Sequence, residues 1–176
     1  MSLELVVTAV GKDRPGIVSE LTGQVHAAGA NLADTRMVNL RGQFALVALV
    51  EGAPDVLEQV KRRLAEAAAK MGLRIDVSDP TSKDARAARD GVPFKLKTYS
   101  MDQPGIVHRI TSYLREHDVN VEELTTRLES APFMGTPVFT MEILMLVPKT
   151  VSVKKLRTAL EELGDQLNCD VDIDPA

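Results

Sequence analysis

The first half of the chain switches between the two-residue period of a strand and the longer period of a helix. Apolar residues alternate with mostly polar ones over residues 3–9, which predicts a strand. Residues 15–28 then carry one apolar stripe, typical of an amphipathic helix, and Gly29 is placed to end it. Residues 31–40 predict a second strand. The nearly all-apolar residues 44–50 predict a third strand that is central and buried.

A turn over residues 41–43, a second helix and a fourth strand complete this pattern. The helix opens at residues 51–55, presents a buried face over residues 57–71 and ends at Gly72. Residues 73–77 alternate again, as a strand does. The predicted order of elements is therefore β-α-β-β-α-β.

The same order restarts in the second half of the chain. The stretch Asp-Arg-Pro-Gly-Ile-Val at Asp13 to Val18 returns 89 positions later as Asp-Gln-Pro-Gly-Ile-Val at Asp102 to Val107. The turn over residues 129–137 is about six residues longer than its counterpart in the first copy. We therefore predict a duplicated domain. Its second copy has strands over residues 94–99, 121–128, 139–147 and 171–173, and helices over residues 104–117 and 153–167.

Two such units predict an α+β protein. It is built from two tandem ferredoxin-like domains, each an antiparallel sheet with both helices on one face. The polar stretch from Ser78 to Pro93 has only small apolar side chains and is interpreted as the linker. We place domain 1 at residues 1–79, the linker at 80–92 and domain 2 at 93–176. The uncovered sheet faces and edges need partners, which the sister repeat or another chain could supply.

The repeated hexapeptide predicts a small anion site. Pro15 fits the first turn of a helix, because its missing N–H would have no partner there. Asp13 can accept hydrogen bonds from the free N–H groups of that turn. Gly16 lacks a Cβ, so another molecule can approach the backbone. The N–H groups of Gly16, Ile17 and Val18 lie at the positive end of the helix dipole.

Both copies of the hexapeptide supply candidate ligand-binding residues. A free amino acid carries the carboxylate that such a site would bind, and a neighbouring acidic side chain could meet its ammonium group. The alternative is an ordinary Asp-Pro-Gly helix start that binds nothing. The candidates are Asp13, Arg14, Pro15, Gly16, Ile17 and Val18 in the first copy, and Asp102, Gln103, Pro104, Gly105, Ile106 and Val107 in the second.

Asn31 and Asn120 are further candidates at the same 89-residue offset, each at the start of a second strand. We expect that end of the strand to return to the same sheet edge as the hexapeptide loop. An amide can donate to a carboxylate and accept from an ammonium group at once. The alternative is a loop amide that caps its own backbone.

Composition and charge narrow the classes of function. The formal net charge is −4 and no segment is strongly basic, which argues against direct nucleic-acid binding. The basic residues 61–63 lie among acidic ones on the predicted second helix, so they are interpreted as a solvated helix face. The single cysteine, Cys169, cannot form an intrachain disulfide, and no Cys/His metal spacing is present. Without a signal peptide or a membrane-length apolar run, we expect a soluble cytoplasmic protein.

No catalytic constellation is evident. The three histidines, His26, His108 and His117, lie on predicted helices without a matching Ser or Cys nucleophile motif. A P-loop and a dinucleotide-binding glycine motif are both missing from the sequence. We expect no enzyme activity, no metal and no cofactor. His108 directly follows the second hexapeptide, so it could line a ligand site. The alternatives are an ordinary surface histidine and a catalytic residue of an unrecognised enzyme.

With this order of elements, the first hexapeptide and Asn31, the first half of the chain resembles an ACT domain. The second half resembles one too, through residues 102–107 and Asn120. The stretch from Val6 to Val18 is similar to the opening of the glycine cleavage system transcriptional repressor family. Two tandem ACT domains, a mid-chain linker and a longer turn in the second copy also fit that family.

The resemblance implies a regulatory module that binds a small amino acid, glycine or serine, at a domain interface. Proteins of this family are thought to hold a DNA-binding transcriptional activator, with glycine relieving the hold. We therefore expect a non-enzymatic amino-acid sensor that regulates glycine cleavage through protein–protein contact, as a homodimer. The alternative is an amino-acid-sensing regulatory subunit of a metabolic enzyme. Gln103 stands where the first copy has Arg14, so two sites could differ in affinity or selectivity.

Overall fold

The computed structural model describes residues 3–80, 91–130 and 137–176. The chain divides into two compact units, Met1–Ser82 and Lys83–Ala176. Each unit holds its own sheet, its own pair of helices and its own hydrophobic core. The duplication that the sequence predicts is therefore a duplication of structure.

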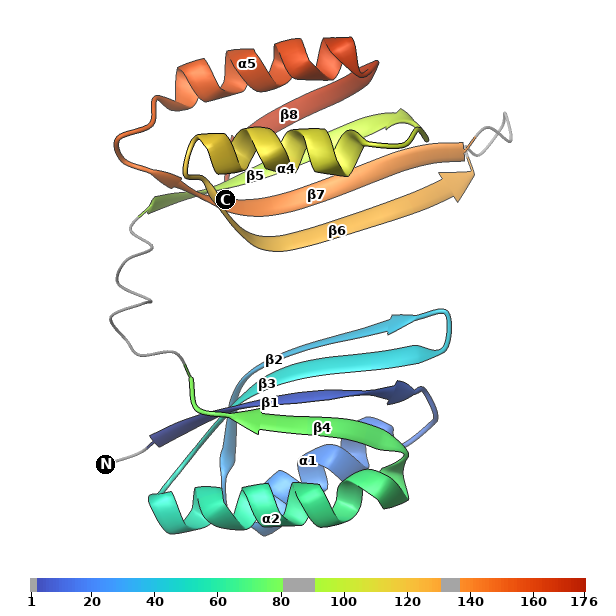
Figure 1. Cartoon of the computed structure of the whole chain (residues 1–176), viewed down its shortest axis with the longest axis vertical. Helices are drawn as coiled ribbons and strands as arrows, with labels where there is room; N and C mark the ends of the chain where they lie inside the picture. The colour runs from blue at the N-terminus through green and yellow to red at the C-terminus, as the bar shows by residue number, and fades with distance from the viewer. Residues whose placement is uncertain (1–2, 81–90, 131–136) are drawn as a thin grey trace. The chain divides into compact units, whose positions relative to one another are not determined.

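Both units follow the predicted β-α-β-β-α-β order (Figure 1). The elements of the first unit are β1 (Leu3–Lys12), α1 (Ile17–Ala27), β2 (Asn31–Leu40), β3 (Gln43–Gly52), α2 (Pro54–Met71) and β4 (Leu73–Ser78). Those of the second are β5 (Gly91–Met101), α4 (Ile106–Glu116), β6 (Asn120–Ser130), β7 (Pro137–Pro148), α5 (Val153–Gln166) and β8 (Cys169–Pro175).

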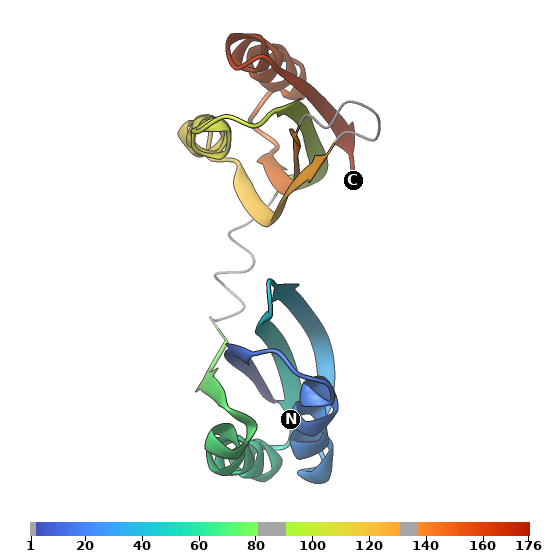
Figure 2. The ribbon, with the colours of Figure 1, turned by 90° about the vertical axis from the view of Figure 1, so that its right-hand side faces the viewer.

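The two sheets share one topology. Their strand orders are β2-β3-β1-β4 and β6-β7-β5-β8, and every neighbouring pair is antiparallel. Within each unit both helices cover the same face of the sheet, and the other face carries no element of that unit (Figure 2). This arrangement confirms the α+β, ferredoxin-like fold. It leaves β2 and β6 as sheet edges beside the central strands β3 and β7.

Each core lies between the sheet and its helices. In the first unit, alternate residues of β1 and β3 face the helices, so Val7 and Phe44 are buried there. Leu21 of α1 and Leu64 of α2 pack onto the same side. Burying a side chain of this kind contributes about 1.5–3 kcal/mol, so the alternation fixes which face each strand turns inward.

Local backbone geometry ends the predicted elements where glycine allows it. Gly29 and Gly72 follow α1 and α2 with positive φ angles of 83° and 69°. Arg41 and Gly42 both have positive φ, which gives the tight two-residue hairpin between β2 and β3. The longer counterpart expected at residues 129–137 lies mostly outside the described residues.

Strand β5 begins earlier than the sequence indicates. Gly91 and Val92 were expected to belong to the linker, but they pair with Pro148 and Val147 of β7. Pro93 is tolerated because it lies beyond the last β5–β8 pair, at an end of the ladder where its missing N–H costs little. The rest of the expected linker, apart from residue 80, lies outside the described residues. None of the helices in the described ranges is long and apolar enough to cross a membrane.

Candidate functional site

The first hexapeptide connects β1 to α1, and its aspartate is tied to a neighbouring hairpin. Asp13 donates its backbone N–H to the carbonyl of Gly42 at 2.8 Å. Its carboxylate Oδ2 accepts a hydrogen bond from Nδ2 of Asn39 in β2. Oδ1 of the same asparagine accepts from the N–H of Gly42 at 3.1 Å. The expectation that Asp13 caps the helix is therefore wrong, because its carboxylate is directed to the end of β2.

Helix α1 begins at Ile17, two residues later than predicted. Gly16 is the residue before it and has a left-handed backbone, with φ of 87°. Gly105 repeats this geometry before α4 with φ of 99°. Pro15 therefore lies in a turn ahead of the helix and not in its first turn. The glycine is required because left-handed backbone is costly for any residue with a Cβ.

A left-handed residue followed by a helix points consecutive N–H groups into one concavity, which suits an anion. Among the described residues, no backbone acceptor is found for the N–H groups of Gly16 and Val18. The N–H of Ile17 makes only a long bond, 3.4 Å, to the carbonyl of Arg14. The N–H groups of residues 105–107 likewise have no backbone acceptor in the described part of the chain. Both helix starts can therefore donate to a bound anion.

The isoleucines of the two motifs contribute to the core. Ile17 is 2% exposed and Ile106 is 1% exposed, and each packs in the hydrophobic core of its unit. Val18 is more open, with 39% of its surface exposed, and Val107 is partly buried against the second core. The side chains of Ile17 and Ile106 therefore anchor the helix start, while their backbone N–H groups face its open end.

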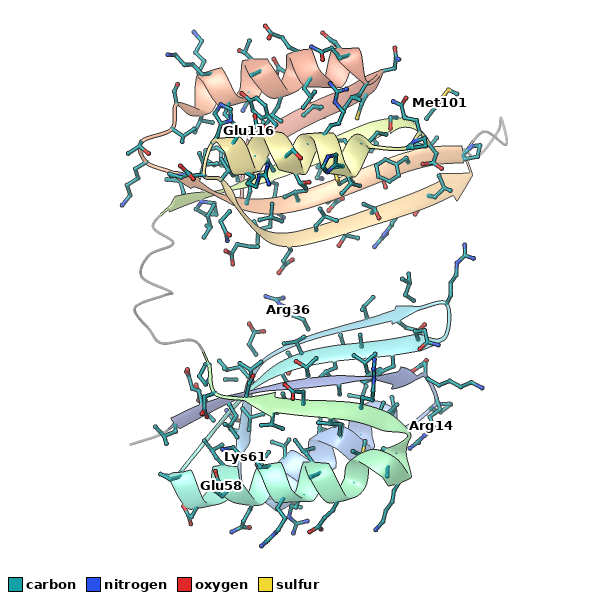
Figure 3. All side chains as sticks on the ribbon, in the orientation of Figure 1. Arg14, Arg36, Glu58, Lys61, Met101 and Glu116 are labelled. Carbon is teal, nitrogen blue, oxygen red and sulfur yellow. The ribbon has the colours of Figure 1, made fainter. Side chains whose placement is uncertain are left out.

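Arg14, which is labelled in Figure 3, is held by an ion pair that the sequence does not suggest. Its two terminal nitrogens lie 2.6 Å from the two carboxylate oxygens of Glu20, in the first turn of α1. This hydrogen-bonded pairing raises the pKa of Arg14 and lowers the pKa of Glu20. Glu20 thus competes with any ligand carboxylate for the guanidinium. Helical spacing gives no warning of this contact, because Arg14 lies in the loop before α1 and only Glu20 belongs to the helix.

The second motif has different polar neighbours. Gln103, at the position matching Arg14, donates from Nε2 to the carbonyl of Leu167. Arg109, at the position matching Glu20, donates to Oε1 of Gln166 at 3.3 Å. The helix start in the second unit therefore carries a guanidinium where the first carries a carboxylate. Asp102, which matches Asp13, is exposed.

The asparagines lie at the wrong end of the sheet for the predicted site. Asn31 pairs with Glu51, which in turn pairs with Glu4 near the beginning of β1. The hexapeptide follows Lys12, at the other end of β1. Eight residues of strand separate the two ends, or roughly 26 Å at 3.3 Å per residue. The expectation of a shared edge is wrong, because β2 runs parallel to β1 and α1 carries the chain back to where β1 begins.

The second unit repeats this separation. Asn120 pairs with Leu146, which pairs with Pro93 near the start of β5, whereas the hexapeptide follows Met101. The amide of Asn120 donates to Glu122 two residues along. Within one unit, the fold therefore brings together the six residues of a hexapeptide but not the asparagine.

The histidines form no catalytic group with one another. His117 ends α4, where its ring stacks on Tyr113 with 4.3 Å between ring centroids. Burial, followed by the negative charges of two nearby glutamates, raises the pKa of Tyr113. In the described ranges, no group of three or more His, Cys, Asp or Glu residues could hold a metal ion. Cys169 is buried as a free thiol.

Comparison with known proteins identifies a family match for the first unit. Residues 4–78 match the family model of the ACT domain. A UPF0237 protein of Methanopyrus kandleri is 38% identical over 71 residues, covering 40% of this chain and 72% of that protein. The glycine cleavage system transcriptional repressor of Escherichia coli K12 is 26% identical over 164 residues, covering 93% of this chain and 85% of that protein.

Solved structures share the fold over the full length. A protein of unknown function from Galdieria sulphuraria has a TM-score of 0.81 at 26% identity, covering 100% of this chain and 99% of its own. A proposed glycine cleavage system transcriptional repressor has a TM-score of 0.71 at 22% identity, covering 99% of this chain and 97% of its own. The match in fold therefore spans both units.

Proposed function

Because this chain belongs to the ACT domain family and resembles the glycine cleavage system transcriptional repressors, we propose that it senses a small amino acid and regulates transcription through contact with another protein. ACT domains are regulatory modules that bind amino acids. The observation that carries the proposal is the pair of left-handed glycines, Gly16 and Gly105, each opening a helix whose first N–H groups are free to donate. Glycine is the first candidate effector and serine the second.

The amino-acid carboxylate would bind at a helix start, beside Gly16 or Gly105. A Cβ built on Gly16 would have one atom within 4 Å, Oε1 of Glu20 at 3.7 Å, and one on Gly105 would have none. The protein therefore leaves that space open, so a bound carboxylate can approach the backbone closely. Asp13 or Asp102 would supply the negative charge for the ammonium group.

Asn31 lies far from the hexapeptide of its own unit, so we propose that a second copy of the chain supplies the asparagine. β2 is a sheet edge, and its residues Val38 and Leu40 are 53% and 69% exposed. Antiparallel pairing of two β2 edges would set the start of one strand beside the end of the other. The partner's Asn31 would then lie near Asp13, which is bonded to the end of β2 through Asn39. This geometry supports a homodimer.

The test of the site is calorimetric titration of the full chain with glycine, in wild type and in the double variant Gly16→Ala and Gly105→Ala. Each added Cβ enters the space of the bound carboxylate, so we expect affinity to fall about tenfold or more. The matched control is Gly29→Ala. It imposes the same left-handed strain at the opposite end of α1 from the hexapeptide. Unchanged affinity in a folded double variant would rule out the site.

The partner is tested by affinity capture from cell extract with and without glycine. The proposal expects a DNA-binding transcriptional activator that is retained without glycine and released by it. Recovery of a biosynthetic enzyme and no transcription factor would instead assign the chain as a regulatory subunit of that enzyme.

A further inference from the structure

The open face of the second sheet is hollowed and carries charge. The helices α4 and α5 leave one face of this sheet uncovered (Figure 2). A cavity of about 250 Å³ lies on that face between strands β5, β6 and β7. The side chains of Thr98 and Met141 are fully buried on the helix side, so these residues meet the hollow through their backbone. The remaining lining residues are Lys97, Tyr99, Thr125, Arg127, Glu129, Thr140 and Glu142.

Strand register arranges these side chains in rows. Arg127 of β6 pairs with Thr140 of β7, which pairs with Tyr99 of β5. The next row contains Glu142 of β7, which lies opposite Lys97. Directly paired residues point to the same face of a sheet, and diagonal neighbours are within reach of long side chains. The hollow therefore has a guanidinium, a carboxylate, an ammonium group and a phenol ring around one space.

The positions of the first unit that match Arg127, Tyr99 and Glu142 lack this chemistry, although Arg36 and Asp34 pair elsewhere on the same face. Val10 lies 89 positions before Tyr99 and pairs with Ala45, which pairs with Val38. The row that reads Arg-Thr-Tyr in the second unit thus reads Val-Ala-Val in the first. Val47 likewise takes the place of Glu142, opposite Thr8. Because the same fold is built with apolar residues here, its stability does not require the charged row.

The charged groups of the hollow are not satisfied by one another. In the described ranges of the chain, Lys97, Arg127, Glu129 and Glu142 form no ion pair and no side-chain hydrogen bond. Two cations and two carboxylates balance to zero, so a simple anion would meet repulsion from the carboxylates and a simple cation from the cations. A ligand that carries both charges matches the lining.

We propose that this hollow is a binding site for a small zwitterion, a free amino acid, separate from the two hexapeptides. The planar guanidinium of Arg127 can hold a carboxylate through two parallel hydrogen bonds. Glu142, diagonal to Arg127, accepts from the ammonium group. The ligand side chain lies over Tyr99, a residue that is 45% exposed. A volume of 250 Å³ suits a ligand smaller than a drug-sized molecule.

The proposal is tested by calorimetric titration of the full chain with glycine, serine and each of the other proteinogenic amino acids. The variants Arg127→Val and Glu142→Val introduce the residues that the first unit carries at the matched positions, so both are expected to fold. The control, Lys95→Val, removes a cation from the same face outside the hollow and matches Val6. Each site variant should weaken binding about tenfold or more, and the control should not.

Two further readouts separate this site from the hexapeptide site. The amide and the N-acetyl derivative of the bound amino acid each lose one charge, so each should bind about tenfold or more weakly to this hollow. Binding that survives Gly16→Ala with Gly105→Ala but is lost in Arg127→Val supports the hollow and contradicts the hexapeptide site. The opposite pattern overturns the present inference and leaves the proposed function standing. Absence of binding by all twenty amino acids also overturns it.

Discussion

Gly16 and Gly105 show why one residue type returns at one position of a duplicated motif. Their positive φ angles, 87° and 99°, turn the chain from a strand into a helix. The sequence indicates a helix start and a possible anion site, but it explains only part of why glycine is needed there. Close approach of a ligand explains the missing Cβ, whereas the backbone conformation is required even without a ligand.

The strain at Gly16 can be measured against a second glycine in the same helix. Gly16→Ala should destabilise the chain by about 1 kcal/mol, because alanine is disfavoured in left-handed backbone. Gly23 lies inside α1 with nothing within 4 Å of an added Cβ, so Gly23→Ala should stabilise it by about 0.5–1 kcal/mol. Urea denaturation measures the free energy of unfolding of both variants. If both substitutions changed it by the same amount in the same direction, the assigned backbone geometry would be contradicted.

The ion pair of Arg14 with Glu20 predicts an acid-side effect. Because the pKa of Glu20 is lowered in the folded chain, its contribution to stability is present above the unfolded-state pKa. That contribution is lost as the pH falls through the lower folded-state pKa. Arg14→Gln, which introduces the residue of the second copy, should return the pKa of Glu20 towards its ordinary value. Carbon NMR of the carboxyl group measures this, and an unchanged titration would contradict the pairing.

Thr98 offers a stabilising substitution in the second core. Its side chain is fully buried, and its hydroxyl has no hydrogen-bond partner among the described residues. The first unit has Ala9 at the matched position. Thr98→Val removes the unsatisfied hydroxyl with little change of shape, so we expect a gain of about 1 kcal/mol in the free energy of unfolding. Loss of stability in urea denaturation would show that the hydroxyl is satisfied in solution.

The order of elements was predictable because each helix or strand has its own spacing of apolar residues and its own terminating residues. The alternation of β1, the apolar run of β3 and the stripe of α2 are local patterns, and Gly29 and Gly72 end the helices as expected. The contacts that shape the candidate site are not local. Asp13 accepts a hydrogen bond from Asn39, 26 positions away, and no pattern in the sequence predicts that contact.

Asn31 and Asn120 show that the sequence also does not reveal which strand ends lie together in the sheet. Their recurrence at one offset suggested a shared role, but strand direction decides which residues meet. Asn31 begins a strand that runs parallel to β1, so it cannot return to the end of β1 within one unit. The two asparagines do occupy equivalent positions in the two units, but the expectation that each lies beside the hexapeptide of its own unit is wrong.

Edge strand β2 carries the prediction for assembly. If two copies pair through β2, Val38→Lys should disrupt the dimer, because lysine on an edge strand opposes pairing. Light scattering should then report about 19.2 kDa for the variant and twice that mass for the wild type. The control is Val92→Lys, which makes the same change at an exposed position of β5. A wild-type chain that is monomeric would contradict assembly through this edge.

At the scale of the whole molecule, the two units keep one fold and differ in surface chemistry. Arg14 with Glu20 in the first becomes Gln103 with Arg109 in the second. On the open sheet face, a row of Val38, Ala45 and Val10 in the first becomes Arg127, Thr140 and Tyr99 beside a hollow in the second. Because both cores are preserved, these differences are free to serve binding. We infer that the duplication separates roles between the two units.

Calorimetric titration of the wild-type chain with glycine, followed by serine, measures the proposed effector binding itself. We expect saturable binding with a defined number of sites, and loss of that binding when Gly16 and Gly105 are both replaced by alanine. Binding of neither amino acid would contradict the proposed effectors. Binding that is unchanged in the folded double variant would contradict the assignment of the site to the hexapeptides.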